Sequence, residues 1–180
     1  IIKIGMIGQL FPPKGWQDFI HTVKYIHNKS DRKFQALIIG EGEQMGDLKA
    51  LVKRLNLEDI ISFEGYISNI NDKLNELDFI LFTTHREGLS VAILEAMSAG
   101  LPQVITDVGG GKEQIIHGKN GCVVERGNIE KMGDYCLKLM KEQSLRTSFG
   151  TKSREIVKKK FSEDTMLKKH VNLYYKLLEK

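Results

Sequence analysis

The sequence predicts a doubly wound α/β fold, in which helices cover both faces of a mainly parallel sheet of about six strands. Short apolar runs alternate with helical segments along most of the chain. The runs are continuously apolar, which is typical of parallel strands buried on both faces. With 180 residues, 41% of them hydrophobic and 28% charged, the chain is large enough for one substantial core. We therefore expect residues 1–180 to form a single domain.

Each element has its own signal in the sequence. Apolar spacing predicts helices over residues 14–28, 45–55 and 90–99, and Gly100 and Pro102 end the last of these. From residue 129 onward the pattern is helical to the end, and these helices are expected to pack on the sheet. Ligands of such sheets bind beyond the carboxyl ends of the strands. The six predicted strands are residues 1–7, 34–39, 60–63, 79–82, 104–106 and 122–124.

Several classes of protein are excluded by composition. No apolar run approaches the roughly 18 residues that a membrane-spanning helix needs. Cys122 and Cys136 match neither a metal-binding spacing nor a disulfide framework, so we expect thiols in a reducing cytoplasm. No His, Cys and carboxylate cluster in the sequence has the spacing of a metal site.

Charge is concentrated near the end of the chain. The net charge is +4, and residues 151–180 hold nine Lys or Arg against four Asp or Glu, most densely at residues 158–160. The run of residues 158–160 lacks interleaved aromatic residues and any recognition motif, so nucleic acid is not an expected partner. A solvated helical face, an anionic membrane surface and a partner domain remain as interpretations. The chain begins with Ile1, already within a predicted strand, and we expect it to be a piece of a longer protein.

Two glycine-containing loops follow the first two predicted strands. Gly8, Gln9, Lys14 and Gly15 lie between the first strand and the first helix, where free N–H groups and a lysine suit an anion. The loop is not a Walker motif, because no Gly-Lys-Ser/Thr follows. The second loop, around Gly40, falls short of a dinucleotide fingerprint. A plain tight turn is an alternative for both.

Two glutamates stand eight residues apart around the start of the 90–99 helix. Glu87 lies in the loop after a strand, and Glu95 lies between apolar neighbours inside the helix. A carboxylate on a helix that otherwise looks buried needs hydrogen-bond donors, which ligand hydroxyls can supply. Gly88, Leu89 and Ser90 present N–H groups at the helix start. The alternative is a surface Glu87 and a Glu95 that interacts only with the helix dipole.

A further glycine run, residues 109–111, follows the fifth predicted strand, and Asn120-Gly121 lies shortly beyond it. Glycines at the end of a strand allow a close approach of backbone to a ligand, although a flexible turn is an alternative.

The order of these pieces resembles the C-terminal domain of retaining glycosyltransferases of the group 1, or family four, type, which are built from two facing Rossmann-like domains. The glutamate pair with its seven-residue spacer, followed by a small-residue helix end and Pro102, is the most specific element. The resemblance covers at least residues 5–125. The matching segments are residues 8–15, 40–42, 63–67, 87–102, 106–113 and 120–121.

The resemblance implies a site for a nucleoside diphosphate sugar, in a reaction that needs no metal or other cofactor. It implies that Glu87 lies beside the donor sugar as the catalytic residue, Glu95 accepts hydrogen bonds from the ribose, and Lys14 contacts the diphosphate. It also implies a separate N-terminal acceptor-binding domain in the same chain. The remaining expected binding residues are Gly8, Gln9, Gly15 and Gly40 around the phosphates, Tyr66 and Ile67 near the base, and Gly88, Leu89 and Ser90 near the sugar.

The sequence departs from the family pattern at Gln9, where an Arg is usual, and one cationic donor to the diphosphate is lost. His85, two residues before Glu87, is a weaker candidate for ligand contact. We expect retaining sugar transfer in glycan, polysaccharide or glycolipid biosynthesis, in the cytoplasm or at the inner face of the membrane. A degenerate nucleotide-binding module, and a sugar epimerase or phosphorylase of the same two-domain plan, are the alternatives.

Overall fold

The computed structural model describes residues 1–178 and contains a six-stranded, fully parallel sheet in the order β3-β2-β1-β4-β5-β6. This order confirms the predicted doubly wound fold. The order reverses between β1 and β4, the neighbours at the centre of the sheet. The loops that follow these two strands lead to helices on opposite faces of the sheet. The strands are β1 (Ile2–Ile7), β2 (Phe34–Ile39), β3 (Ile61–Gly65), β4 (Phe79–Phe82), β5 (Gln103–Thr106) and β6 (Gly121–Val124).

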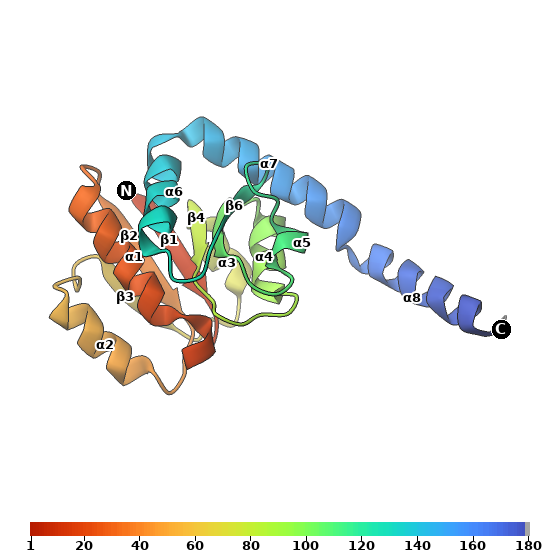
Figure 1. The fold of residues 1–180 in the computed structure, drawn as a ribbon, viewed down its shortest axis with the longest axis horizontal. Coiled ribbons are helices and arrows are strands. Elements are labelled where there is room, and N and C mark those ends of the chain that lie inside the picture. Colours follow the sequence, from red (N-terminus) through yellow and green to blue (C-terminus); the bar gives the residue numbers. More distant parts are fainter. Residues whose placement is uncertain (179–180) are drawn as a thin grey trace.

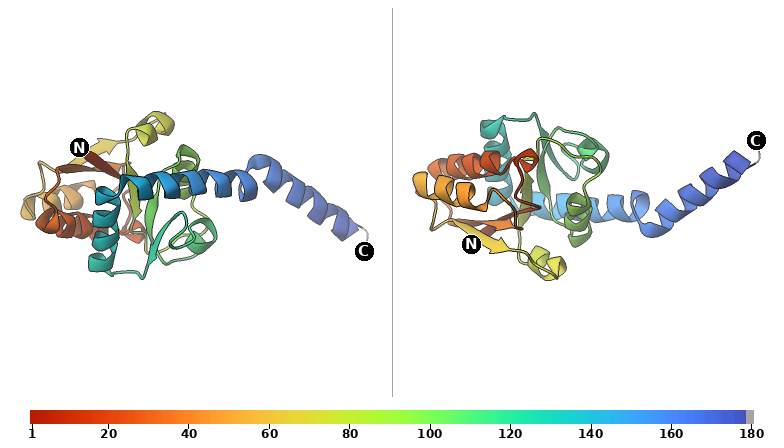
Figure 2. Two further views of the ribbon diagram at one scale, coloured as in Figure 1. Left: turned by 90° about the horizontal axis from the view of Figure 1, so that it is seen from above. Right: turned by 90° about the horizontal axis from the view of Figure 1, so that it is seen from below.

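Helices cover both faces of the sheet (Figures 1 and 2). One face carries α1 (Trp16–Lys29), α2 (Met45–Arg54) and α6 (Ile129–Lys141), and α1 packs against both of the others. The other face carries α3 (Ile70–Asn75) and α4 (Val91–Ala99). The sequence pattern does not predict α3 or the four-residue α5 (Gly111–Gln114), because neither is long enough to show a helical period.

The core lies between the sheet and these helices. The strands β4 and β5 are buried at every position, which explains the continuously apolar sequence of β4 and the apolar centre of β5, where the end residues Gln103 and Thr106 are buried polar groups. Trp16 and Phe19 of α1 are fully buried, and their rings meet edge to face at 6.1 Å. Each such side chain contributes about 1.5–3 kcal/mol by leaving water. The first turn of α1 is therefore fixed firmly against the sheet.

The segment before α1 differs from the prediction. Residues Pro12–Lys14 form one turn of 3₁₀ helix, labelled η1, and α1 begins at Trp16 instead of Lys14. Gly15 separates the two with φ 69°, a left-handed conformation that breaks the helical path. Lys14 consequently lies at the loop mouth and not on the helix face.

Helix α7 (Gln143–Lys160) packs on α4 and α6, as expected for the C-terminal helices. Its contact with α4 is close, because a Cβ on Gly150 would lie 2.0 Å from the carbonyl oxygen of Gly100. The Arg154 guanidinium donates to the carbonyls of Ser98 and Ala99 at 3.2 and 2.8 Å, which satisfies the end of α4.

Helix α8 (Glu163–Leu178) projects away from the body of the domain and has no buried residue (Figures 1 and 2). It therefore departs from the expectation that every C-terminal helix packs on the sheet. Among the helices in residues 1–178, none is both long enough and apolar enough to cross a membrane. The last two residues of the predicted helical stretch, and of the predicted domain, lie outside the described residues.

Replacement of Gly150 by Ala is expected to destabilise the domain. The new methyl group collides with rigid backbone of Gly100, so α7 must shift from α4, at a cost of about 1–3 kcal/mol. Urea unfolding measures the change. Gly46→Ala is the matched control, because Gly46 of α2 has open space around its Cβ position, and we expect a gain of about 0.4–1 kcal/mol there. Equal effects of the two substitutions would contradict the packing argument.

Candidate functional site

Four loops meet at the carboxyl edge of the sheet, after β1, β2, β3 and β4. Three of them and α4 enclose a pocket of about 550 Å³, within the usual range for ligand sites. Among the expected binding residues, Gly8, Gln9, Gly40, Tyr66, Ile67 and Glu95 all line it. The full lining is Ile7, Gly8, Gln9, Ile39, Gly40, Glu41, Tyr66, Ile67, Ser68, Ile70 and Glu95.

The floor of the pocket is formed by tightly stacked backbone. The Gly8 amide donates to Ile39 O at 3.0 Å, and the Gly40 amide donates to Gly65 O at 2.8 Å. Gly40 has φ 138°, and a Cβ there would lie 2.0 Å from Gly8 O. A side chain at position 40 would push the first two loops apart. These glycines therefore form tight turns, and the pocket lies beside those turns.

Glu95 reaches this pocket from α4. Its side chain is half-buried, and among residues 1–178 it has no hydrogen bond or ion pair with another protein group. A carboxylate in this position retains its full capacity to accept hydrogen bonds. Tyr66 lies across the pocket with 75% of its surface exposed, so its ring is available to a planar ligand.

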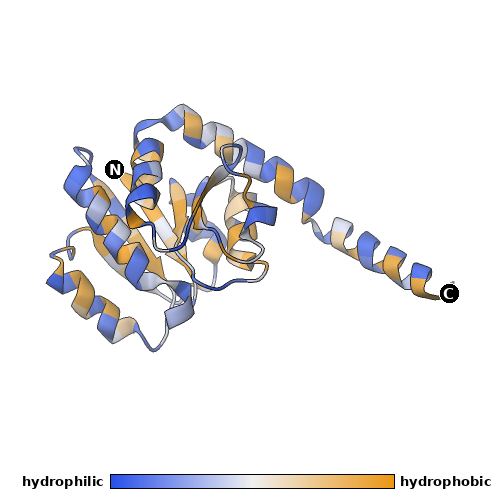
Figure 3. Cartoon of the chain, in the orientation of Figure 1, coloured by the Kyte–Doolittle hydropathy of each residue, from blue (hydrophilic) through white to orange (hydrophobic). Residues whose placement is uncertain are grey.

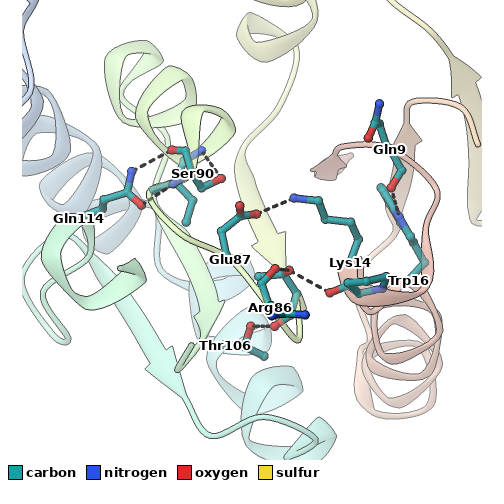
Figure 4. A network of polar contacts seen from close by, with 11 residues as sticks. Gln9, Lys14, Trp16, Arg86, Glu87, Ser90, Thr106 and Gln114 are labelled. Carbon is teal, nitrogen blue, oxygen red and sulfur yellow. Dashed lines mark hydrogen bonds and ion pairs between the residues drawn. The ribbon is translucent and has the colours of Figure 1, made fainter. Parts of the chain in front are cut away.

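Lys14 and Glu87 form a second cluster next to the pocket. Their side chains point toward each other from separate loops, and Lys14 Nζ lies 2.6 Å from Glu87 Oε2 (Figure 4). A Cβ on Gly8 would lie 3.9 Å from Lys14 Cδ, so the pair adjoins the pocket. Both side chains remain partly exposed, at 31% and 20%. The ion pair is therefore within reach of solvent and of any ligand in the pocket.

The loops that carry this pair are joined by hydrogen bonds. The Thr83 hydroxyl donates to Gly15 O at 2.8 Å, and the His85 amide donates to Pro13 O at 2.8 Å. A Cβ on Gly15 would lie 2.0 Å from Thr83 O, so only glycine permits this approach. The end of β4 is consequently fixed to the turn that presents Lys14.

The start of α4 is held by its own cap and by a contact with α5. The Ser90 hydroxyl caps the helix by accepting from the Ile93 amide at 3.5 Å. The Ser90 amide donates to Gln114 Oε1 at 3.2 Å, and Gln114 Nε2 donates to Ser90 O at 2.8 Å (Figure 4). The Ser90 amide is thus engaged within the protein. In the described part of the chain, the amides of Gly88 and Leu89 have no such partner.

The glycine run of residues 109–111 contacts the Glu87 loop. The Gly110 amide donates to Gly88 O at 3.1 Å, and a Cβ on Gly109 would lie 1.7 Å from Glu87 O. These glycines allow backbone to approach backbone, whereas the sequence suggested an approach to a ligand. Sequence reasoning also missed Gln114, whose role appears only when α5 is placed beside α4.

The two cysteines lie in the interior. Cys122 and Cys136 are buried, and burial raises the pKa of the Cys122 thiol to about 11 and that of Cys136 well above its ordinary value. Both are thiols at neutral pH and are poor nucleophiles. Within residues 1–178 no three side chains of His, Cys, Asp or Glu gather in a way that could hold a metal ion.

The family model described as "Glycosyl transferases group 1" matches residues 2–156, which include every loop of this site. The chain belongs to this family.

Two curated relatives are considerably longer than this chain. N-acetyl-alpha-D-glucosaminyl L-malate synthase of Bacillus anthracis is 31% identical over 162 residues, which cover 90% of this chain and 42% of that protein. Poly(ribitol-phosphate) alpha-N-acetylglucosaminyltransferase of Staphylococcus aureus is 30% identical over 172 residues, which cover 95% and 35%. The chain spans less than half the length of these relatives.

Solved structures match the fold closely. A TarM variant of S. aureus, crystallised with Fondaparinux, alpha-GlcNAc-glycerol and UDP, superposes with a TM-score of 0.90 at 28% identity, over 96% of this chain and 35% of that one. The C-terminal domain of LpcC, a group 1 family protein of Francisella tularensis, gives 0.82 at 26% identity, over 90% and 87%. This chain therefore has the fold of a C-terminal domain of its family.

The Lys14–Glu87 pair predicts opposite effects of two substitutions on anion binding. Lys14→Ala removes a charged donor and is expected to weaken the binding of inorganic pyrophosphate about tenfold. Glu87→Gln removes a competing anion from Lys14 and is expected to strengthen that binding. Calorimetry on the chain measures both. Lys131→Ala, an exposed substitution on α6, is the control. Weaker pyrophosphate binding by Glu87→Gln would show that the two charges do not compete.

Proposed function

We propose that the chain is the donor-binding part of a glycosyltransferase that moves a sugar from a nucleoside diphosphate to an acceptor, with retention of configuration at the anomeric carbon. The main support is the arrangement at the carboxyl edge of the sheet. The pocket contains the carboxylate of Glu95, which has no partner among residues 1–178, and it adjoins an accessible Lys14–Glu87 ion pair. Family membership supports the same conclusion.

The proposed pose follows from these two clusters. The nucleoside occupies the pocket, where Glu95 accepts hydrogen bonds from the ribose and Tyr66 and Ile67 adjoin the base. The diphosphate lies toward Lys14, where Gln9 supplies a neutral contact in place of a charged one. The sugar lies near Glu87 and the unengaged amides of Gly88 and Leu89, at the start of α4.

Lys14 changes partner in the proposed reaction. In the free protein Lys14 forms an ion pair with Glu87. In the complex the Lys14 ammonium group pairs with the diphosphate instead. Negative charge grows on the diphosphate as it leaves, and a positioned lysine and helix N-termini stabilise that charge without a metal ion. Glu87, released from Lys14, then presents a carboxylate to the positively charged sugar centre. The same pair thus serves both ends of the breaking bond.

We further propose that the donor is UDP-N-acetylglucosamine. Three curated relatives carry N-acetylglucosaminyl in their names, and the TarM structure contains UDP. Two of these names specify an alpha product, which an α-linked donor gives only by retention. The acceptor is proposed to bind to another domain, since the relatives are more than twice as long as this chain.

The decisive experiment is turnover of UDP-N-acetylglucosamine by the full-length parent protein, with analysis of the products. We expect UDP release and transfer of the sugar to an acceptor without addition of metal, and persistence of activity in a chelator. Epimerised sugar without an acceptor, or dependence on inorganic phosphate, would instead identify an epimerase or a phosphorylase. Binding of UDP without any turnover would identify a degenerate module.

Glu95→Ala is expected to weaken UDP binding by about 1.5–3 kcal/mol, roughly tenfold or more, because ribose hydroxyls lose a charged acceptor. Calorimetry with UDP and with inorganic pyrophosphate tests the placement of the ribose. Pyrophosphate affinity should not change, since Glu95 is assigned to the ribose alone. An equal loss for both ligands, or no loss for UDP, would contradict this placement.

We also propose that α8 brings the protein to the cytoplasmic face of an anionic membrane. Large apolar side chains of α8, including Leu167, Val171 and Tyr174, are 47–61% exposed, and apolar residues recur along the helix in Figure 3. Helical spacing places Lys168 at the edge of this apolar face and Lys169 and Lys176 on the opposite side of the helix. An apolar face bordered by lysines is complementary to a negatively charged lipid surface.

Co-sedimentation with phosphatidylglycerol vesicles tests this contact. The double substitution Lys168→Glu and Lys169→Glu should weaken binding by about 1 kcal/mol or more for each charge removed. Lys131→Glu on α6 is the control and should have little effect. Equal binding to uncharged phosphatidylcholine vesicles, or no binding to either, would rule out an electrostatic membrane contact.

A further inference from the structure

A second close contact between polar side chains lies near Glu87 but outside the donor pocket. His85 Nε2 is 2.7 Å from Asp18 Oδ2, and 67 residues separate the two in sequence. We propose that His85 and Asp18 form a positioning pair that holds Glu87 in place opposite Lys14. This inference rests on the proposed function. It predicts that turnover depends on the pair, whereas affinity for the free nucleoside diphosphate does not.

The position of the Glu87 loop depends on a few contacts on either side of Glu87. Arg86, Gly88 and Leu89 are exposed, so apolar packing contributes little to the position of the loop. On the α5 side, Gly88 is held by the Gly110 amide. On the other side, Arg86 O accepts a hydrogen bond from the Thr84 hydroxyl at 3.2 Å, and His85 is held through its amide and its imidazole. Glu87 lies between these two attachments.

Asp18 is a rigid partner because of its place on α1. Its neighbours Trp16 and Phe19 are fully buried, so the first turn of the helix cannot move independently of the sheet. The same turn follows directly from Gly15 and Lys14. One helix start therefore sets the position of Lys14 through the chain and that of Glu87 through the Asp18–His85 contact. Both members of the ion pair are placed relative to the same rigid element.

A purely structural role makes a different prediction. Asp18 also lies in the first turn of α1, where a carboxylate stabilises the helix through its dipole. If that were its only role, loss of His85 would leave turnover unchanged. The side chains of His85 and Asp18 are 37% and 23% exposed, and a pair so accessible to water adds little to overall stability. The variants should therefore fold normally.

Steady-state kinetics of the full-length parent with UDP-N-acetylglucosamine test the proposal, together with UDP affinity. His85→Ala should lower kcat about tenfold or more, because small misplacements of reacting groups are costly. UDP affinity should stay within about threefold. His85→Gln should restore most of the turnover, since its amide can still donate to Asp18. His21→Ala, an exposed substitution one turn along α1, is the matched control and should have no effect.

A double-substitution cycle identifies the pair itself. His85→Ala combined with Asp18→Ala should be no slower than the slower single variant, because the second change removes a contact already lost. Additive losses, unchanged turnover in His85→Ala, or a loss of UDP affinity as large as the loss of kcat would overturn the proposal.

Amide hydrogen exchange over residues 85–90 tests the pair without any donor. His85→Ala should increase exchange in this loop, whereas His85→Gln and His21→Ala should not. Unchanged exchange in His85→Ala would overturn the positioning role. A parent protein that neither binds UDP nor turns over the donor would refute the proposed function, and the exchange measurement would still decide the fate of the pair.

Discussion

The site depends on one contact, in which the end of β4 is hydrogen-bonded to the turn between β1 and α1. β1 and β4 are adjacent at the point where the strand order reverses, so the loops that follow them begin side by side. The Thr83 hydroxyl and the His85 amide then hold those loops to Gly15 and Pro13. Lys14 and Glu87 belong to the two joined loops, and their ion pair follows from this junction.

The glycines around the site matter mainly because they have no side chain, so that the backbones of neighbouring loops can pack closely. At Gly15, Gly40 and Gly109, an added Cβ would overlap the backbone of a different loop, at 2.0, 2.0 and 1.7 Å respectively. Backbone cannot move aside as a flexible side chain can, so any larger residue would separate the loops. The loops that surround the pocket are therefore packed against one another through backbone atoms. Such a frame suits a site whose charges must be held at fixed separations.

The sequence predicted the parts of the structure that depend on local pattern. All six strands were foreseen because they are mainly apolar, and Lys14, Glu87 and Glu95 were recognised in their loops and helix. Contacts between distant segments were not foreseen. Asp18 and His85 carry no mutual signal in the sequence, and Gln114 is an unremarkable glutamine until α5 is placed beside Ser90. Helix α8 kept its predicted helicity, but helical spacing alone does not reveal whether an apolar face is covered.

The neutralisation of Lys14 by Glu87 has a kinetic consequence. Long-range attraction depends on the net charge that a site presents to an approaching ligand, and this pair presents almost none. Under the proposed function, a negatively charged donor would therefore not be steered toward Lys14 by this pair from a distance, and its rate of association should depend little on ionic strength. The attraction would arise after contact, when the diphosphate displaces Glu87. Discrimination among anions would then be exercised in the residence time of the complex.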